Sequence, residues 1–153
     1  MIEIIEYKEE YANDFKRLNL EWLEKYNLTE SHDLEIINDP KATILDTGGC
    51  IYLAKSGDEI VGTAALIKEG DDMYELAKMA VTSSFQGKGI SKLLIEKCLE
   101  KAKKFNARTI ILYSNSKLIT AIALYKKYGF KHIDASDSPF VTADVKMELS
   151  TIL

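Results

Sequence analysis

Residues 79–91 read Met79-Ala80-Val81-Thr82-Ser83-Ser84-Phe85-Gln86-Gly87-Lys88-Gly89-Ile90-Ser91, and this stretch decides the fold. An apolar strand ends at Val81, a short polar connection follows, and an amphipathic helix begins after the second of two glycines. At such a junction the unpaired N–H groups of the helix start and the positive end of the helix dipole point at one place. Because that place binds phosphate, we expect a ligand that carries a pyrophosphate.

Two common phosphate-binding loops do not fit this stretch. A Walker loop ends in Gly-Lys-Ser/Thr, but Gly89 is followed by Ile90 and Ser91. A dinucleotide-binding loop has a third glycine at the position where Lys92 stands. The remaining pattern is Gln86-x-x-Gly89-x-Ser91, and its alternative interpretation is a glycine-rich turn that binds no ligand.

This pattern resembles the acyl-CoA-binding signature of the GNAT superfamily of N-acetyltransferases, Gln/Arg-x-x-Gly-x-Gly/Ala, with Ser91 in the last position. A second block, Leu124-Tyr125-Lys126-Lys127-Tyr128-Gly129-Phe130, resembles the superfamily's Leu-Tyr-x-x-x-Gly-Phe signature. The two blocks stand in the family's order. The resemblance implies an enzyme that transfers an acetyl group from acetyl-CoA to a primary amine by direct attack in a ternary complex.

Hydrophobic spacing predicts an α+β fold, with a mixed, mostly antiparallel central sheet and helices on both faces, as in the GNAT superfamily. The helix after Gly89 carries apolar residues at helical spacing, among them Ile90, Leu94 and Cys98. Helices are expected at 9–25, 32–38, 89–105 and 117–128. Strands are expected at 2–7, 51–55, 60–67, 73–81, 109–113, 130–133 and 141–149.

Composition limits the classes of function. The length of 153 residues predicts a single domain, 1–153. The formal net charge of −4 argues against nucleic-acid binding, and no apolar run is long enough to span a membrane. The acidic start of the chain is unlike a signal peptide. Cys50 and Cys98 lack paired spacing, so we expect reduced thiols, no metal site and a cytoplasmic protein.

The cofactor-binding residues follow partly from the loop and partly from the resemblance. Backbone N–H groups around the loop are expected to surround the pyrophosphate, and its glycines permit positive φ. The resemblance implies a bulge in the preceding strand, which pairs with the pantetheine arm and polarises the thioester carbonyl. The expected acetyl-CoA-binding residues are Met79, Ala80, Val81, Gln86, Gly87, Lys88, Gly89, Ile90, Ser91 and Asn115.

Two residues are candidates for catalysis, Tyr125 from the resemblance and Glu75 from its place on the strand four residues before Met79. Tyr125 is the expected proton donor to the departing thiolate, and its alternative is an ordinary aromatic of an amphipathic helix. Glu75 is the expected general base, acting through water, because a partly buried carboxyl group has a raised pKa. Its alternative is a surface glutamate paired with a lysine, and Asp72 is the next candidate for the base.

The sequence says least about the identity of the acceptor. The resemblance implies that residues 22–33 and 134–140 build its site. Acidic side chains at Glu21, Glu24, Glu30 and Asp33 suit a cationic amine, which is either a small molecule or a peptide. The oligomeric state is open, a homodimer included. The rival function is a catalytically silent CoA-binding or sensing domain, which would need neither Glu75 nor Tyr125.

Overall fold

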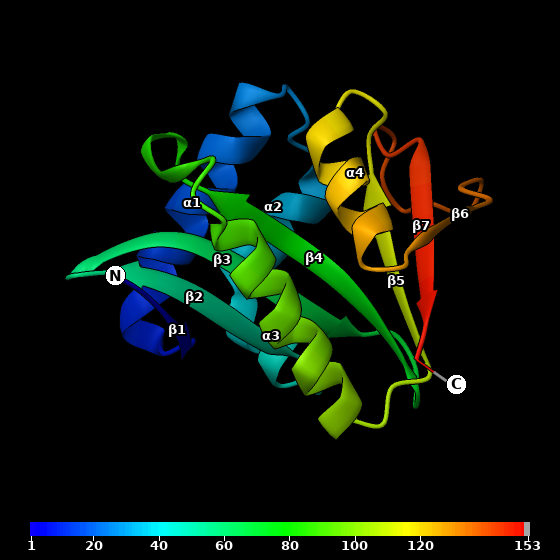
Figure 1. Ribbon diagram of the computed structural model, residues 1–153, viewed down its shortest axis with the longest axis horizontal. Coiled ribbons are helices and arrows are strands. Elements are labelled where there is room, and N and C mark those ends of the chain that lie inside the picture. Colours follow the sequence, from blue (N-terminus) through cyan, green and yellow to red (C-terminus); the bar gives the residue numbers. More distant parts are fainter. Residues whose placement is uncertain (152–153) are drawn as a thin grey trace.

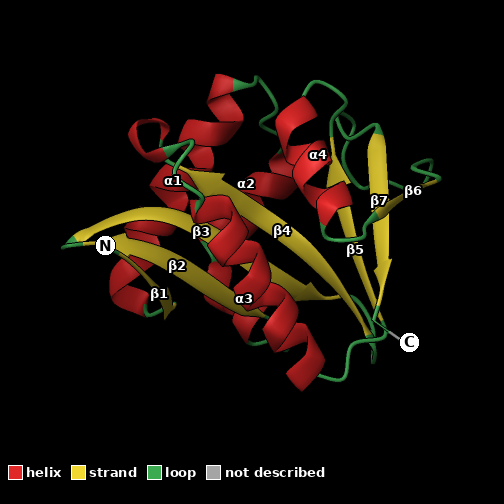
Figure 2. Ribbon diagram, viewed as in Figure 1, coloured by secondary structure: helices red, strands yellow, loops and turns green. Residues whose placement is uncertain are grey.

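The computed structural model describes residues 1–151, and its centre is a seven-stranded sheet in the order β1-β2-β3-β4-β5-β7-β6 (Figures 1 and 2). Neighbouring strands are antiparallel except β4 and β5, which are parallel. This confirms the expected mixed, mostly antiparallel sheet. The strands are β1 (Ile2–Glu6), β2 (Cys50–Ser56), β3 (Glu59–Lys68), β4 (Met73–Val81), β5 (Thr109–Ser114), β6 (Lys131–Ile133) and β7 (Val145–Ser150).

Helices cover both faces of the sheet, as predicted. On one face, α1 (Ala12–Lys25) and α2 (Ser31–Asn38) pack Phe15, Leu18 and Ile37 against the strands. On the other face, α3 (Ile90–Lys104) contributes a buried stripe that includes Leu94 and Cys98. The last helix, α4 (Ile119–Lys127), lies beside α3 and in front of β5 and β7 (Figure 1). Amphipathic periodicity therefore builds two apolar cores, one on each side of the sheet.

Two local features of β4 interrupt its pairing with the neighbouring strands. Opposite β3, Ala77 pairs with Ala65 and Ala80 pairs with Thr63, so two residues of β4 lie opposite one residue of β3. This is a β-bulge, which bends a strand and leaves the extra residue unpaired. Opposite β5, pairing stops after Glu75 and Ile111. The two parallel strands therefore diverge toward the α4 end of the sheet (Figure 1).

The predicted last strand was wrong at its start. It was expected to begin at Val141, but β7 begins at Val145, and Val141 is fully exposed. The Glu30 carboxylate accepts the N–H groups of Val141 and Thr142, at 2.9 and 2.8 Å. Because these backbone groups bond a side chain, they cannot join a β-ladder.

Three other boundaries differ from the sequence pattern. The helix predicted from residue 9 begins as a 3₁₀ turn, Glu9–Tyr11, before α1. The helix predicted from residue 117 begins at Ile119, since the Lys117 N–H group bonds the Asn115 side chain instead. A π-helical turn, Lys41–Leu45, follows Pro40 and was not predicted. Proline stops the preceding helix, yet its fixed φ suits the first position of a new one.

Candidate active site

A cavity of about 670 Å³ lies between the divergent end of β4, the start of α3 and the start of α4. Its β4 wall is the segment beyond Glu75, which shares no residue pairs with β5. An unpaired strand edge has free N–H and C=O groups, so it can pair with an extended ligand in place of the missing strand. We call this space the cofactor cavity. Of the expected cofactor-binding residues it is lined by Met79, Ala80, Val81, Gln86, Gly87, Gly89, Ile90 and Ser91.

The loop of residues 82–89, which we call the phosphate loop, has the backbone conformation that its glycines predicted. Gly87 and Gly89 both have φ of +79°, and a Cβ atom at either position would meet nothing within 4 Å. Gly89 is the N-cap residue of α3, which starts without a side-chain cap. The first N–H groups of α3 are therefore left for a ligand, as an anion site at a helix start requires. The Gln86 side chain fixes the loop by donating to the Val81 carbonyl at 3.1 Å.

Two of the expected cofactor-binding side chains lie elsewhere. The Lys88 ammonium group lies 4.9 Å from the centroid of the Phe85 ring, and Lys88 does not line the cofactor cavity. Asn115 lines a different cavity, where its amide nitrogen donates to the Thr142 carbonyl. The Asn115 amide oxygen accepts the Lys117 N–H group. The structure thus gives Asn115 a role in holding two loops together.

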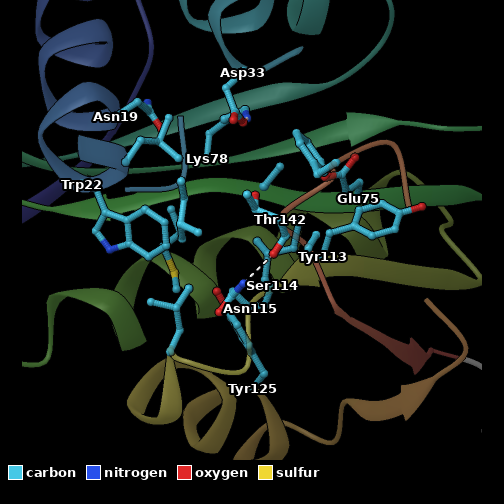
Figure 3. A pocket seen from close by; sticks show the side chains of 18 residues that line it. Asn19, Trp22, Asp33, Glu75, Lys78, Tyr113, Ser114, Asn115, Tyr125 and Thr142 are labelled. Atoms are coloured by element: carbon cyan, nitrogen blue, oxygen red, sulfur yellow. Dashed lines mark hydrogen bonds and ion pairs between the residues drawn. The ribbon is translucent and has the colours of Figure 1, made fainter. Parts of the chain in front are cut away.

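A second cavity, of about 110 Å³, lies on the other side of the divergent strands (Figure 3). It contains an unusual set of buried polar side chains: Asn19, Asp33, Glu75 and Ser114 are each at most 9% exposed. Lys78 joins them and forms an ion pair with Asp33. We call this space the acceptor cavity. Both cavities are lined by Trp22, Met79, Leu118 and Tyr125, so they meet at these four residues.

Glu75 is buried in the acceptor cavity, which rules out the alternative of a surface glutamate. Burial, followed by the neighbouring Glu69 carboxyl group, raises the pKa of its carboxyl group to about 8, whereas Lys78 opposes the shift. A general base works best when its pKa lies near the working pH. Asp72, the other candidate for the base, is exposed on a turn and lies 4.0 Å from Arg108.

Tyr125 projects from α4 to the place where the two cavities meet (Figure 3). Its ring packs edge-on against Phe130, with centroids 6.1 Å apart. Gly129, with φ of +98°, ends the helix, and the Phe130 N–H group bonds back to the Tyr125 carbonyl at 3.2 Å. The Leu-Tyr-x-x-x-Gly-Phe block therefore fixes Tyr125 through a helix end. Burial raises the pKa of the Tyr125 hydroxyl to about 12, so it stays protonated.

Two glutamates hold loops around the cavities. Glu21 of α1 accepts the Ser83 N–H group at 2.9 Å and the Thr82 hydroxyl at 3.0 Å, which ties α1 to the phosphate loop. These hydrogen bonds, that from the Ser83 backbone first, lower the pKa of Glu21. Glu30 fixes the 141–142 segment beside the acceptor cavity. Both residues were expected near an acceptor, and both instead serve as anchors of the surrounding backbone.

The chain matches the model of the acetyltransferase (GNAT) family over residues 9–130. It is 37% identical over 131 residues to the uncharacterized N-acetyltransferase YvbK of Bacillus subtilis (strain 168), and the match covers 83% of each chain. The chain belongs to the GNAT family of acetyltransferases. It is thus an acetyl-CoA-dependent N-acyltransferase by family.

Other relatives and solved structures agree with this family. The human N-acetylaspartate synthetase is 40% identical over 91 residues, which are 59% of this chain but only 30% of that protein. A GNAT-family acetyltransferase structure from Staphylococcus aureus Mu50 has 26% identity and a TM-score of 0.89, and covers 98% of this chain and 99% of its own. The PaiA N-acetyltransferase of Thermoplasma acidophilum, solved with coenzyme A, shares the fold with a TM-score of 0.76 at 20% identity, covering 98% and 99% of the two chains.

Within this GNAT fold, several residues of the acceptor cavity were not found from the sequence. Lys78 is the clearest case, and its signal was visible as a charged residue within an otherwise apolar strand end. Asn19 was hidden in an amphipathic helix. Only the fold brings Lys78 and Asn19 together, because they come from β4 and α1.

Membrane spans and metal-binding groups were sought among the described residues, 1–151. None of their helices is both long enough and apolar enough to cross a bilayer. They also hold no group of three or more histidine, cysteine, aspartate or glutamate side chains arranged to bind a metal ion. Within the same range Cys50 and Cys98 are free thiols, and Cys98 is fully buried.

Proposed function

We propose that this chain transfers an acetyl group from acetyl-CoA to a primary amine, by direct attack within a ternary complex. One observation carries the proposal: the cofactor cavity and the acceptor cavity meet between Tyr125 of α4 and Met79, which lies on the edge of β4 that no strand of residues 1–151 covers. A thioester that lies along this edge would have its carbonyl carbon at the meeting point. An amine in the acceptor cavity would then lie within reach of it.

The residues of the cofactor cavity fit CoA. Open backbone at Gly87 and Gly89 and the uncapped start of α3 suit the pyrophosphate. The unpaired β4 edge suits the amide-bearing pantetheine arm, as expected for Met79, Ala80 and Val81. Two structural neighbours support this ligand: the Thermoplasma acidophilum enzyme holds coenzyme A, and a GNAT-family acetyltransferase from Elizabethkingia anophelis holds acetyl-CoA.

The chemistry needs one base and one proton donor. The amine nitrogen attacks the thioester carbon, the C–N bond forms, and the C–S bond breaks. Glu75 accepts the proton that the nitrogen loses, through water, because its raised pKa lies near neutral. Met79 lies in the bulge, outside the pairs with β3, and its backbone N–H is the candidate to polarise the thioester carbonyl. The Tyr125 hydroxyl donates to the departing sulfur.

The rival, a silent CoA-binding domain, leaves the acceptor cavity unexplained. Burying the carboxyl group of Glu75 and the Asp33–Lys78 pair costs stability, and a domain that only binds CoA gains nothing from them. We further propose that residues 1–153 act as one domain in the cytoplasm, alone or as a homodimer.

The test is an acetyl-transfer assay with a panel of amines: amino acids, amino-acid amides, polyamines, aminoglycosides and lysine peptides. Release of free thiol from acetyl-CoA is followed, and the acetylated amine is identified by mass spectrometry. We expect saturable thiol release that depends on at least one amine. Tight acetyl-CoA binding by calorimetry, with no amine-dependent thiol release across the panel, would favour the silent domain.

A further inference from the structure

Lys78 occupies an unusual backbone position. In a regular strand its side chain would lie with Leu76, on the α3 side of the sheet. The bulge changes this, because both Lys78 and Met79 lie opposite Ala64, and Lys78 takes a left-handed φ of +54°. Its side chain therefore reaches Asp33 of α2 on the opposite face (Figure 3). A non-glycine residue in this conformation costs about 1–2 kcal/mol, and such strain persists mainly at functional sites.

The ion pair leaves the lysine with free donors. The side chains of Lys78 and Asp33 are 7% and 5% exposed. One Asp33 oxygen accepts from Lys78, and the other accepts the Glu30 N–H group at 3.2 Å, which caps α2. The Lys78 ammonium carries three N–H donors, and among the described residues Asp33 is its one hydrogen-bond acceptor. The ammonium also lies 5.2 Å from the centroid of the Phe140 ring.

The rest of the acceptor cavity complements a molecule with charges of both signs. Glu75 lies three residues before Lys78 on the same strand and lines the same cavity. The cavity therefore offers ammonium N–H donors from one residue and a carboxyl group from another. Its volume is about 110 Å³, a small cavity that suits a small metabolite.

We infer that the acceptor is a small amine that also carries a carboxylate, of the amino-acid class, and that Lys78 binds this carboxylate while Glu75 faces the amine. The inference rests on the proposed acetyl transfer. A carboxylate satisfies ammonium donors that are otherwise costly to bury. A polyamine would instead place a second cation against Lys78. Lys78 is then a residue that determines specificity.

The experiment compares each amino acid with its own primary amide, which has nearly the same size but no carboxylate. The measured quantity is the ratio of kcat/KM for the acid to that for the amide. Three proteins are compared: the wild type, the double variant Lys78→Met/Asp33→Asn, and Lys101→Met. The double variant removes both charges of the pair, so neither is left buried without its partner. Lys101 is the matched control, because its ammonium also lies 5.2 Å from an aromatic ring centroid but outside both cavities.

We expect the acid-to-amide ratio to fall at least about tenfold in the double variant and to stay unchanged in Lys101→Met. Differences in the basicity of the two amines cancel, since the same pair is used with every protein. An equal ratio in wild type and double variant would overturn the inference and leave Lys78–Asp33 as a structural ion pair.

A binding measurement separates this inference from the proposed function. The Tm of each protein is recorded with saturating CoA and increasing amino acid or amide. We expect the amino acid, and not its amide, to raise the Tm of the wild type, and we expect the double variant to lose this increase. A carboxylate-dependent increase without any acetyl transfer would support the inference while the proposed activity fails. Transfer with no preference for carboxylates, or no response in either assay, would overturn the inference.

Discussion

The two cavities of this protein are built in opposite ways. The features of the cofactor cavity that suit a ligand belong to the backbone: a strand edge that β5 leaves unpaired, two glycines with positive φ and the uncapped start of α3. The acceptor cavity is made of side chains, and several of them are charged and buried. One cavity draws its main wall from a nearly continuous stretch, residues 79–92, whereas the other collects residues from α1, α2, β4, β5 and the loop before β7.

We relate this difference to two tasks: binding the cofactor and selecting the amine. Backbone groups bind the same phosphates and amides whatever the surrounding side chains are, so the cofactor cavity tolerates changes of sequence. Side chains such as Lys78 and Glu75 determine the charge and protonation of the acceptor cavity, so we expect this cavity to select which amine reacts. If the comparison holds, substitutions in the acceptor cavity change turnover and selectivity, and those in the phosphate loop change acetyl-CoA affinity.

The largest effect is expected at Tyr125, where the cavities meet. Tyr125→Phe removes only the hydroxyl, and we expect kcat to fall by about 10²–10⁴-fold, because the departing sulfur loses its proton donor. Acetyl-CoA affinity, measured by calorimetry, should change little. Tyr128→Phe is the control on the same helix: it removes a hydroxyl that bonds Glu96 at 2.7 Å, outside both cavities. Equal activity of the two variants would make Tyr125 an ordinary core aromatic.

The next effect concerns Glu75 and depends on pH. The base form of Glu75 increases as pH rises through about 8. In the wild type, kcat/KM should therefore rise with pH and level off above that value. Glu75→Gln removes the proton acceptor, and we expect a loss of about 10²-fold near neutral pH. The loss should shrink as pH approaches the pKa of the acceptor amine, since the neutral amine then forms without help.

Asp72→Asn is the control for this dependence of kcat/KM on pH, since Asp72 lies on an exposed turn near Arg108. Its kcat/KM should follow the wild-type curve at every pH. Parallel curves for Glu75→Gln and the wild type, with the same acid limb, would assign the proton to water or to another group.

A smaller effect is expected in the phosphate loop. A Cβ atom at Gly89 points into open space where the pyrophosphate would approach. Gly89→Ala should therefore raise the acetyl-CoA dissociation constant by about tenfold. Gly57→Ala is a matched control, because Gly57 also has a positive φ and an open Cβ position but lies in a distant turn. Both variants should lose about 1–2 kcal/mol of stability from strain, and only Gly89→Ala should lose affinity.

The cofactor side could be predicted from sequence because its signals are local. Gly87, Gly89 and Gln86 lie within a few residues, and helix and strand periodicity place them at a sheet-to-helix junction. The same locality explains the correct fold: each of the strands β2, β3 and β4 has its own apolar pattern and turn. Where the pattern misled, as at Val141, a distant carboxylate had taken the backbone hydrogen bonds.

The acceptor side could be predicted only in part. Glu75 was found from its place on the strand that leads to Met79, but the extent of its burial could not be known without the fold. The ion pair of Lys78 with Asp33 joins residues 45 positions apart, and it depends on a bulge that turns one side chain to the other face. Side-chain alternation in a strand, the usual guide, gives the wrong face at a bulge.

The smallest predicted effect is on stability. It tests whether burying the Glu75 carboxyl group in the acceptor cavity lowers the free energy of unfolding. Glu75 has a pKa of about 8 in the folded protein, above its ordinary value of 4.5. Protonation therefore favours the folded state, so this contribution is fully present below pH 4.5 and is lost as pH rises through about 8.

Glu75→Gln cannot ionise and should not show this loss. The Tm of the variant minus that of the wild type should thus increase between pH 4.5 and pH 8. Scanning calorimetry at several pH values measures this difference, in which the titration of groups far from Glu75 cancels. A difference that stays constant with pH would mean that Glu75 ionises as freely in the folded protein as in the unfolded chain, and that burying its carboxyl group in the acceptor cavity has no cost in stability that depends on pH.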